Sequence, residues 1–314
     1  MGSTDLTGSK PGAFVTLLTR DKFLPGAAVL YRSFQDVKSR YPLIGIYTDT
    51  LSEDSLRVLR DMGMEMIRVE FLYPPAETAH GCERRFVDAW TKVRAFELIE
   101  YERVVLLDCD IVIRRNFDEL ITMDLAPDHI AGAHACACNP RRFPHYPPDW
   151  TPENCAHTTV THPTAPPVKA STFTSPTQPR THGLLNTGLV VLRPSLSVFS
   201  QISAYLATSP LVSTFTFADQ DLLAHFFEGR WTSINWFYNA LKSLKLQHEP
   251  MWADAEVRCL HYIFAEKPWD IKPGEAGDFE STHKWWWEAY ALLEKDLSAE
   301  DGEYVRSFVP ALKA

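Results

Sequence analysis

Residues 103–112 read RVVLLDCDIV, an apolar run that ends in Asp108-Cys109-Asp110. An apolar run without polar alternation is typical of a strand buried on both faces, as in a parallel sheet. Parallel α/β sheets bind their ligands beyond the carboxyl ends of the strands, which is where the two aspartates stand. This segment therefore predicts both the class of fold and the place of its site.

Strands and helices alternate on both sides of this segment. Further strands are predicted at residues 13–18 (AFVTLL), 43–47 (LIGIY), 64–69, 184–192 (LLNTGLVVL) and 258–263 (RCLHYI). Helices are predicted at residues 25–40, 52–61, 90–101, 196–206, 218–227 and 282–295. Such an order predicts an α/β fold with a mostly parallel, doubly wound central sheet.

The two ends and the middle of the chain differ in composition. Residues 1–12 are polar and rich in Gly and Ser, so we expect a disordered tail without a signal peptide. Residues 13–314 are expected to form a single domain that ends in helices. Residues 140–182, rich in Pro, Thr, His and Ser, are expected to be an irregular insertion in this domain.

The overall composition limits the partners. The formal net charge of -9 argues against nucleic acids and anionic membranes, which attract basic surfaces. No apolar run approaches the roughly 20 residues of a membrane span. The six cysteines are scattered without a CxxC pair, which favours a reducing, cytoplasmic setting.

The pair Asp108 and Asp110 is the first candidate site. In an extended chain both carboxylates point to one side, where they repel each other and resist desolvation. A divalent cation relieves both problems, and hard oxygen ligands suit Mg²⁺ or Mn²⁺, which also bind phosphate oxygens. The alternative is an ordinary acidic turn.

Two later segments carry further candidates. In HYIFAEKPW, His261 closes a strand and could complete a metal site, while Lys267 could neutralise a phosphate. The alternative is a structural histidine with a surface lysine. Asn186 precedes a glycine in a strand, and Asp219 begins a helix, where capping is the favoured explanation from the residues alone.

Five segments in this order resemble glycosyltransferase family 8, which contains glycogenin and the plant galactinol synthases. They are AFVTLLTRDKFLPGAAVL, AWTKVRAFELIEYERVVLLDCDIVI, LLNTGLVVLRPS, FADQDLL and HYIFAEKPW, within residues 14–269. Tyr41-Pro42, Tyr73-Pro74 and Lys284-Trp285-Trp286 are more similar to the galactinol synthase branch. The resemblance implies a Rossmann-like, GT-A type nucleotide-sugar fold. It also implies retaining transfer of galactose or glucose from a UDP-hexose, with Mn²⁺ or Mg²⁺, to a small polyol such as myo-inositol or to a sugar.

The resemblance also implies a role for individual residues. Asp108, Asp110 and His261 would bind the metal, and Lys267 would hold the diphosphate. Asn186, Asp219 and Gln220 would surround the sugar as the catalytic group, with Asp219 as nucleophile or as a hydrogen-bonding residue in a same-face attack. The remaining donor contacts would be Leu17, Leu18, Thr19, Phe23, Lys92 and Cys109, the first four of them at the uracil and ribose.

Two positions depart from the family pattern. Phe264 stands three residues after the histidine, where members often carry glycine close to phosphate. Arg20 stands where glycogenin has an amide side chain. We therefore expect altered contacts to the diphosphate and the donor.

Other readings stay open at this point. One is a self-glucosylating primer protein of the glycogenin type, and a homodimer is one expected assembly. A zinc-binding interaction module could use His134, Cys136, Cys138, Cys155 and His157, although Cys-x-Cys lacks the usual zinc-finger spacing. The favoured alternative is that Cys136 and Cys138 are small buried strand residues. Trp285, Trp286 and Trp287 cannot share one helix face, so we expect most of them in the core.

Overall fold

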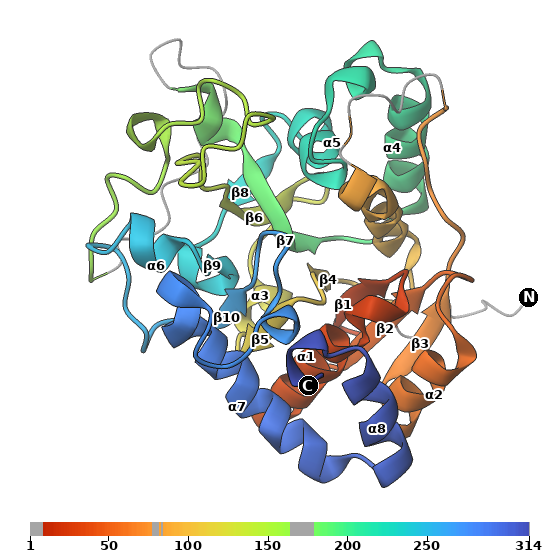
Figure 1. Cartoon of the computed structure of the whole chain (residues 1–314). Coiled ribbons are helices and arrows are strands. Elements are labelled where there is room, and N and C mark those ends of the chain that lie inside the picture. The colour runs from red at the N-terminus through yellow and green to blue at the C-terminus, as the bar shows by residue number, and fades with distance from the viewer. Residues whose placement is uncertain (1–8, 77–81, 83, 164–178, 314) are drawn as a thin grey trace, which may run out of the picture.

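The computed structural model of the chain describes residues 9–76, 82, 84–163 and 179–313. Among these residues one large sheet crosses the molecule, with its strands in the order β3-β2-β1-β4-β7-β6-β8 (Figure 1). Its strands are β1 (Ala13–Leu18), β2 (Leu43–Tyr47), β3 (Glu65–Arg68), β4 (Val104–Leu107), β6 (Ile130–His134), β7 (Leu185–Leu192) and β8 (Trp231–Ser233). Only β7 runs against its neighbours, so the predicted mostly parallel sheet is confirmed.

A small sheet continues from the large one. Its strands are β5 (Ile111–Ile113), β10 (Cys259–His261) and β9 (Ala240–Leu241), in the order β5-β10-β9. β5 follows β4 after a three-residue turn and pairs antiparallel with β10. The DCD sequence is therefore the junction of the two sheets.

Helices pack around both sheets. They are α1 (Leu24–Asp36), α2 (Glu53–Asp61), α3 (Glu119–Thr122), α4 (Leu196–Thr208), α5 (Asp219–Phe226), α6 (Leu244–Gln247), α7 (Glu280–Asp296) and α8 (Ala299–Ser307). α1 packs against β5 and α7, whereas α4 and α5 pack against the segment Arg84–Glu97. None of the helices among the described residues combines the length and the apolar character of a bilayer-spanning segment.

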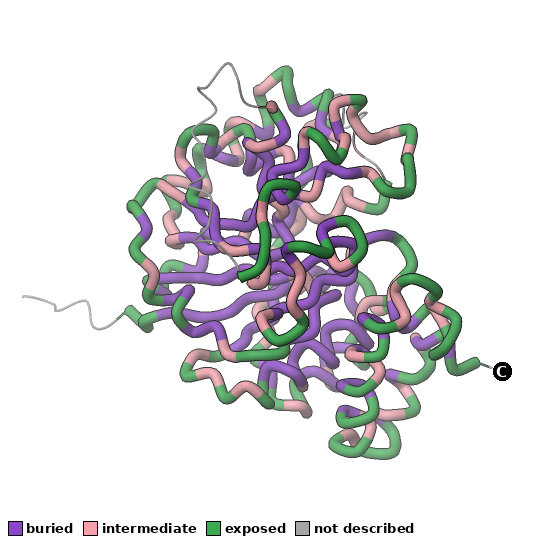
Figure 2. Tube along the Cα trace, turned by 90° about the vertical axis from the view of Figure 1, so that its left-hand side faces the viewer, coloured by how far each residue is buried: buried purple, intermediate pink, exposed green. Residues whose placement is uncertain are grey.

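The large sheet is buried on both faces. Phe14 and Leu107 belong to the apolar cluster on one face, and Val15 and Leu106 belong to the cluster on the other. Figure 2 shows this buried interior enclosed by an exposed shell. Burial on both faces explains why β1 and β4 are apolar at consecutive positions.

The prediction of an α-helix at residues 90–101 is wrong. The chain instead forms 3-10 turns over Arg84–Glu97. Trp90, Val93 and Phe96 are all buried at a spacing of three residues, which is the period of a 3-10 helix. The apolar face expected from the sequence is therefore present, but on a more tightly wound backbone.

Several boundaries also differ from the predictions. The first helix ends at Asp36 rather than at residue 40, and Lys38 adopts a positive φ of 51° beyond it. Residues 1–8 of the predicted tail lie outside the described residues, whereas Lys10 pairs with the backbone of Glu100 and Glu102. In the described part of the insertion only short turns form, at Pro152–Asn154 and Arg180–Gly183.

Candidate active site

Backbone hydrogen bonds fix the two aspartates beside the histidine. β4 ends directly before Asp108, β5 begins directly after Asp110, and β10 ends at His261. The amide of Asp108 donates to the carbonyl of Gly188, and the amide of Tyr262 donates to the carbonyl of Asp110, both at 2.9 Å. The junction of the sheets therefore sets the separation of these three side chains.

Each aspartate divides its two oxygens between the histidine and a lysine. Asp108 Oδ2 and Asp110 Oδ1 face His261 Nε2, at 3.6 Å and 3.3 Å. The second oxygen of Asp108 contacts Lys92 Nζ, and that of Asp110 contacts Lys267 Nζ, each at 2.5 Å. Two carboxylate oxygens and one ring nitrogen thus converge, with an ammonium group on either side.

This set of donors fits a divalent cation. The three converging atoms lie within 4.8 Å of one another. Adjacent ligands of an octahedral Mg²⁺ lie about 3 Å apart, slightly closer than the 3.3 Å and 3.6 Å that separate His261 Nε2 from the two carboxylate oxygens. His261 Nδ1 lies 2.9 Å from Asn239 Oδ1, so it carries the proton and leaves the lone pair of Nε2 directed at the aspartates. Asp108, Asp110 and His261 could together hold such an ion.

Gly188 makes room for the histidine. A Cβ atom at this position would lie 2.2 Å from Cε1 and 2.3 Å from Nδ1 of His261, far inside contact distance. The amide of Gly188 also donates a hydrogen bond to Asn186 Oδ1 at 3.0 Å. The glycine in LLNTG is therefore required for the imidazole to reach the aspartates.

Asp110 is held ionised. Burial would raise its pKa, but the charge of Lys267, together with that of the imidazole of His261 whenever it is protonated, outweighs burial and keeps the pKa far below its ordinary value. Its side chain is only 11% exposed, so these partners act with little solvent screening. The carboxylate is thus a permanent anion at any physiological pH.

Lys92 links the cluster of Asp108, Asp110 and His261 to α5. Its ammonium contacts Asp108 and, at 3.0 Å, Asp219 Oδ2. Burial would lower the pKa of Lys92, but the two carboxylates raise it above its ordinary value, so the residue stays charged. Burial raises the pKa of Asp219 despite the attraction of Lys92.

The predicted capping role of Asp219 is wrong. The N-cap position of α5 is Ala218, and no side chain caps this end. Asp221 instead accepts hydrogen bonds from the amides of Thr216 and Phe217, at 2.8 Å and 2.9 Å. Asp219 points to Lys92, so it is a residue of the site and not a helix cap.

A chain of amides runs from the histidine to α5. Asn239 Nδ2 donates to Asn186 Oδ1 at 2.8 Å, and Asn186 Nδ2 donates to Gln220 Oε1 at 3.1 Å. Asn239 is 1% exposed and is a site residue that no motif indicated. Through it, the orientation of His261 is coupled to the side chains of Asn186 and Gln220.

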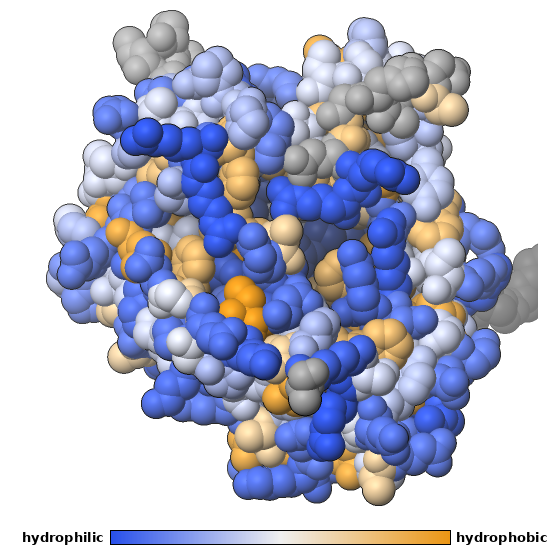
Figure 3. Space-filling model, viewed as in Figure 1, coloured by the Kyte–Doolittle hydropathy of each residue, from blue (hydrophilic) through white to orange (hydrophobic). Residues whose placement is uncertain are grey.

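The cluster opens into a cleft of about 560 Å³. Figure 3 shows the corresponding face of the molecule hollowed near its middle, with hydrophilic side chains around the hollow. The predicted site residues that line the cleft are Leu17, Thr19, Phe23, Lys92, Asp108, Cys109, Asp110, Asn186, Asp219, Gln220, His261 and Lys267. Leu18 is 1% exposed in the apolar core and does not line the cleft, because β1 turns it to the opposite face from Leu17.

Other walls of the cleft were not predicted individually. Tyr146 and Trp150, from the insertion, line it and pack on Phe217, with ring centroids 5.2 Å apart in both pairs. Arg20, where the sequence leads us to expect altered donor contacts, also lines it and is held by Asp88, with Nε 2.6 Å from Oδ2. Aromatic side chains in a long irregular loop were a signal that could have indicated a binding surface.

The turn between His261 and Lys267 keeps the backbone form expected of glycine. Phe264 has a φ of 79°, in the left-handed region that other residues rarely adopt. Lys267 then donates to the carbonyl of Tyr262 at 2.8 Å, and its own amide donates to Asp270 Oδ2 at 3.0 Å. The turn therefore has, at Phe264, a backbone conformation that glycine adopts readily, although the side chain here is phenylalanine.

Comparison with known proteins places this architecture in a family. The model of Glycosyl transferase family 8 matches residues 14–272. Similar proteins include galactinol synthase 1 of Ajuga reptans, 27% identical over 307 residues, which cover 96% of this chain and 87% of that protein. Galactinol synthase 2 of Arabidopsis thaliana is 27% identical over 290 residues, which cover 90% of this chain and 82% of that protein.

Solved structures share the fold. The galactosyltransferase LgtC, in complex with donor and acceptor sugar analogs, aligns with a TM-score of 0.62 at 14% identity. The alignment covers 93% of this chain and 99% of that one. The bifunctional glycosyltransferase WbbM aligns with a TM-score of 0.61 at 14% identity, covering 96% of this chain and 52% of that one. The predicted GT-A type architecture is confirmed by these alignments.

Proposed function

The chain belongs to glycosyltransferase family 8 and is a glycosyltransferase, and on that basis we propose that it transfers a hexose from a UDP-hexose to a small hydroxylic acceptor. The observation that carries the proposal is the convergence of Asp108, Asp110 and His261 in the wall of the cleft, between Lys92 and Lys267. Such a set can hold both a divalent cation and the diphosphate of a nucleotide-sugar.

The charges of the site favour this pair of ligands. Asp108, Asp110 and Asp219 carry three negative charges against the two positive charges of Lys92 and Lys267, which leaves a net charge of minus one. A diphosphate alone would be repelled, whereas with a divalent cation the sum becomes plus one. A bound Mn²⁺ or Mg²⁺ would stabilise the negative charge that develops on the departing UDP.

The residues around the sugar would act by orienting the sugar for attack at its anomeric carbon. The amide groups of Asn186 and Gln220 are tied to each other and can hold sugar hydroxyls in one direction. Asp219 is 3% exposed and bound to Lys92, which suits a fixed hydrogen-bond acceptor better than a nucleophile that must move and form a bond. We therefore propose retention by same-face attack, in which the acceptor hydroxyl gives its proton to the departing phosphate.

An Asp219→Asn variant tests this mechanism. Same-face attack predicts a partial loss of kcat, roughly 10- to 100-fold, because only the orientation and the charge next to Lys92 change. A covalent mechanism instead requires a loss near the background rate and a trapped glycosyl-enzyme in the wild type. Rapid quenching followed by mass spectrometry of the intact protein distinguishes them, with Asp221→Asn as the matched control on the same helix.

The acceptor that we propose is myo-inositol or a similar polyol, with galactose as the sugar. The support is the similarity to galactinol synthases over most of the chain. The aromatic wall of Tyr146 and Trp150 offers apolar faces on which the C–H face of a ring polyol can pack. All six cysteines are free thiols, which fits the reducing cytoplasm that we propose as the setting.

The test is UDP release from UDP-galactose and from UDP-glucose, with Mn²⁺ or EDTA and with or without myo-inositol. The proposal predicts Mn²⁺-dependent release that myo-inositol accelerates and that Asp110→Asn abolishes. Mn²⁺-dependent UDP release that myo-inositol does not accelerate would refute the proposed acceptor but leave the proposed donor site standing. Hexoses found on the protein itself by mass spectrometry would favour a self-glucosylating primer, and the absence of turnover with every donor would refute the proposed activity.

A further inference from the structure

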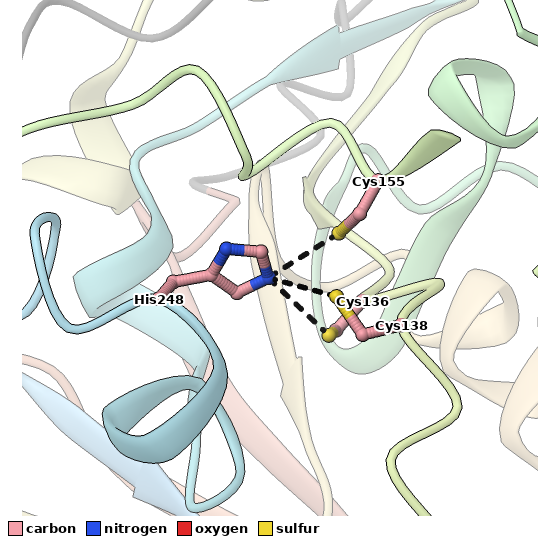
Figure 4. Close-up of side chains that lie close together, drawn as sticks. All are labelled: Cys136, Cys138, Cys155 and His248. Atoms are coloured by element: carbon pink, nitrogen blue, oxygen red, sulfur yellow. Dashed lines mark hydrogen bonds between the residues drawn. The ribbon is translucent and has the colours of Figure 1, made fainter. Parts of the chain in front are cut away.

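A second cluster of metal-ligating side chains lies outside the proposed catalytic site. Cys136 and Cys138 follow β6, Cys155 follows the turn Pro152–Asn154, and His248 ends α6. Figure 4 shows the four side chains pointing toward one another from these separate segments. Their ligand atoms all lie within 4.8 Å of one another.

The distances match a tetrahedral metal site. The Nε2 atom of His248 lies 3.7 Å from the sulfur of Cys136, 3.2 Å from that of Cys138 and 3.4 Å from that of Cys155. Zn–S bonds of about 2.3 Å and Zn–N bonds of about 2.0 Å at tetrahedral angles put sulfur and nitrogen ligands about 3.6 Å apart. The three distances lie on both sides of this value.

The ligand chemistry selects the metal. Three thiolates and one imidazole form the Cys₃His set of structural zinc sites, and soft sulfur ligands disfavour Mg²⁺ and Mn²⁺. A disulfide would use only two of the three cysteines, and all three are free thiols. Cys138, Cys155 and His248 are each 6% exposed or less, so water hardly reaches them. Thiols form only weak hydrogen bonds, so without a metal ion the buried imidazole of His248 would have only weak partners on this side.

We propose that Cys136, Cys138, Cys155 and His248 bind a structural zinc ion, distinct from the divalent cation of the catalytic site. This corrects the set suggested by sequence spacing, which named His134 and His157. His157 Nε2 lies 3.0 Å from the carbonyl of His134, and its ring packs on His248 with centroids 5.6 Å apart. His157 is therefore a neighbour of the ligand and not a ligand.

The zinc ion has a structural task in this fold. It joins the exit of β6, the irregular insertion and α6, which regular secondary structure does not connect. Tyr146 and Trp150, which line the cleft, lie between the second and third cysteine ligands in sequence, and Cys136 itself lines the cleft. We infer that the zinc ion holds the aromatic wall of Tyr146 and Trp150 against Phe217, which lies two residues before Asp219. That this wall contacts the acceptor rests on the proposed function.

The test is the zinc content of the full-length protein, purified under reducing conditions and dialysed against EDTA to remove weakly bound cations. We expect one zinc ion per chain by mass spectrometry of the metal. Replacement by Co²⁺ is expected to give the absorption of tetrahedral cobalt with thiolate charge-transfer bands, which a site of aspartates and histidine cannot produce. These two readouts need no variant and no activity.

Variants then assign the ligands. Cys138→Ser and His248→Ala are expected to lose the zinc ion, whereas Cys82→Ser, His157→Gln and Asp110→Asn are expected to keep it. Wild-type protein with no zinc and six titratable thiols would overturn the proposal, as would a disulfide within the cluster. Because Asp110→Asn removes the proposed activity but leaves zinc in place, failure of the zinc site and failure of the proposed function give different results.

Discussion

At the scale of single residues, the site depends on a side chain that is not itself one of the proposed metal ligands. Asn239 Oδ1 accepts a hydrogen bond from His261 Nδ1, and Asn239 Nδ2 donates to Asn186, so Asn239 fixes which ring nitrogen faces Asp108 and Asp110. Partners of this kind usually change metal affinity by 10- to 100-fold when removed. We class Asn239 as a positioning residue.

The prediction for Asn239→Ala is a loss of Mn²⁺ affinity of roughly 10- to 100-fold, with kcat at saturating Mn²⁺ reduced much less. Electron paramagnetic resonance of free Mn²⁺ measures the affinity directly. Asn116→Ala, which removes a hydrogen bond to the carbonyl of Val37 instead, serves as the control and is expected to bind normally. Equal affinity in Asn239→Ala and wild type would show that the histidine orients without this residue.

A second residue-scale prediction concerns Lys242, whose side chain is 1% exposed. Burial, together with the charges of Lys267 and Arg141, lowers its pKa from an ordinary value of 10.5 to about 7. The folded protein therefore binds the proton less tightly than the unfolded chain, and stability rises with pH between about 7 and 10.5. The cost is fully present below pH 7 and corresponds to at most roughly 5 kcal/mol.

Lys242→Met is thus expected to gain stability relative to wild type at pH 6.5 and to lose that advantage as the pH approaches 10. Loss of the hydrogen bonds to the carbonyl of Glu266 and to His283 shifts the difference by a constant but does not change its dependence on pH. Urea unfolding of both proteins at pH 6.5, 8 and 9.5 measures it. A difference that is flat with pH would mean that Lys242 stays protonated in the fold.

At the scale of elements, the turn after β10 allows a backbone effect to be separated from a side-chain effect. Phe264 combines a φ of 79° with a ring that is 7% exposed and lies under Arg141. Truncation of the ring costs roughly 3 kcal/mol or more, whereas relief of the left-handed conformation returns only about 1 kcal/mol. We expect both Phe264→Ala and Phe264→Gly to be less stable than wild type.

The order of stability of these two variants is the more specific prediction. Glycine is ordinarily less stable than alanine by roughly 0.5–1 kcal/mol, but here Phe264→Gly is expected to be the more stable of the two by about 1 kcal/mol. Thermal or urea unfolding of the pair gives the sign. The usual order, with alanine more stable, would show that the turn abandons its positive φ once the ring is removed.

The elements found from the sequence are those with a strong apolar pattern. β1 and β2 match their predicted bounds because both are short, largely apolar runs that are followed by a threonine. β6 and β8 were not predicted, since the first reads IAGAH, with residues that disfavour strands, and the second has only three residues. Trp286 is buried, and Trp285 and Trp287 pack partly buried against the core, as most of the tryptophan run was expected to do.

The same limit applies to the sites. Asp108, Asp110 and His261 could be named because each stands at the end of an apolar strand and the family pattern joins them. Asn239 and His248 could not, because Asn239 ends the short 3-10 helix Trp236–Asn239 and His248 follows the one-turn helix α6, and each meets its partners only through tertiary folding. His248 lies 93 residues beyond Cys155, a separation that no local spacing rule covers.

At the scale of the whole molecule, a net charge of -9 must coexist with a site for an anionic donor. Lys92 and Lys267, the two lysines beside the metal-ligating aspartates, are both paired with carboxylates, so they offer little positive potential to a diphosphate on their own. A divalent cation would supply that potential locally without a basic surface. The central claim is therefore that nucleotide binding requires the metal held by Asp108, Asp110 and His261.

Calorimetric titration of UDP into the protein, with Mn²⁺ and with EDTA, tests this claim most directly. The account predicts UDP binding with Mn²⁺ that weakens at least roughly 100-fold, about 2.7 kcal/mol, when the metal is removed. Asp110→Asn is expected to show the same weakening even in the presence of Mn²⁺, while Asp221→Asn binds as wild type does. Equally tight UDP binding with EDTA, or in Asp110→Asn, would contradict the account, because the lysines alone would then hold the diphosphate.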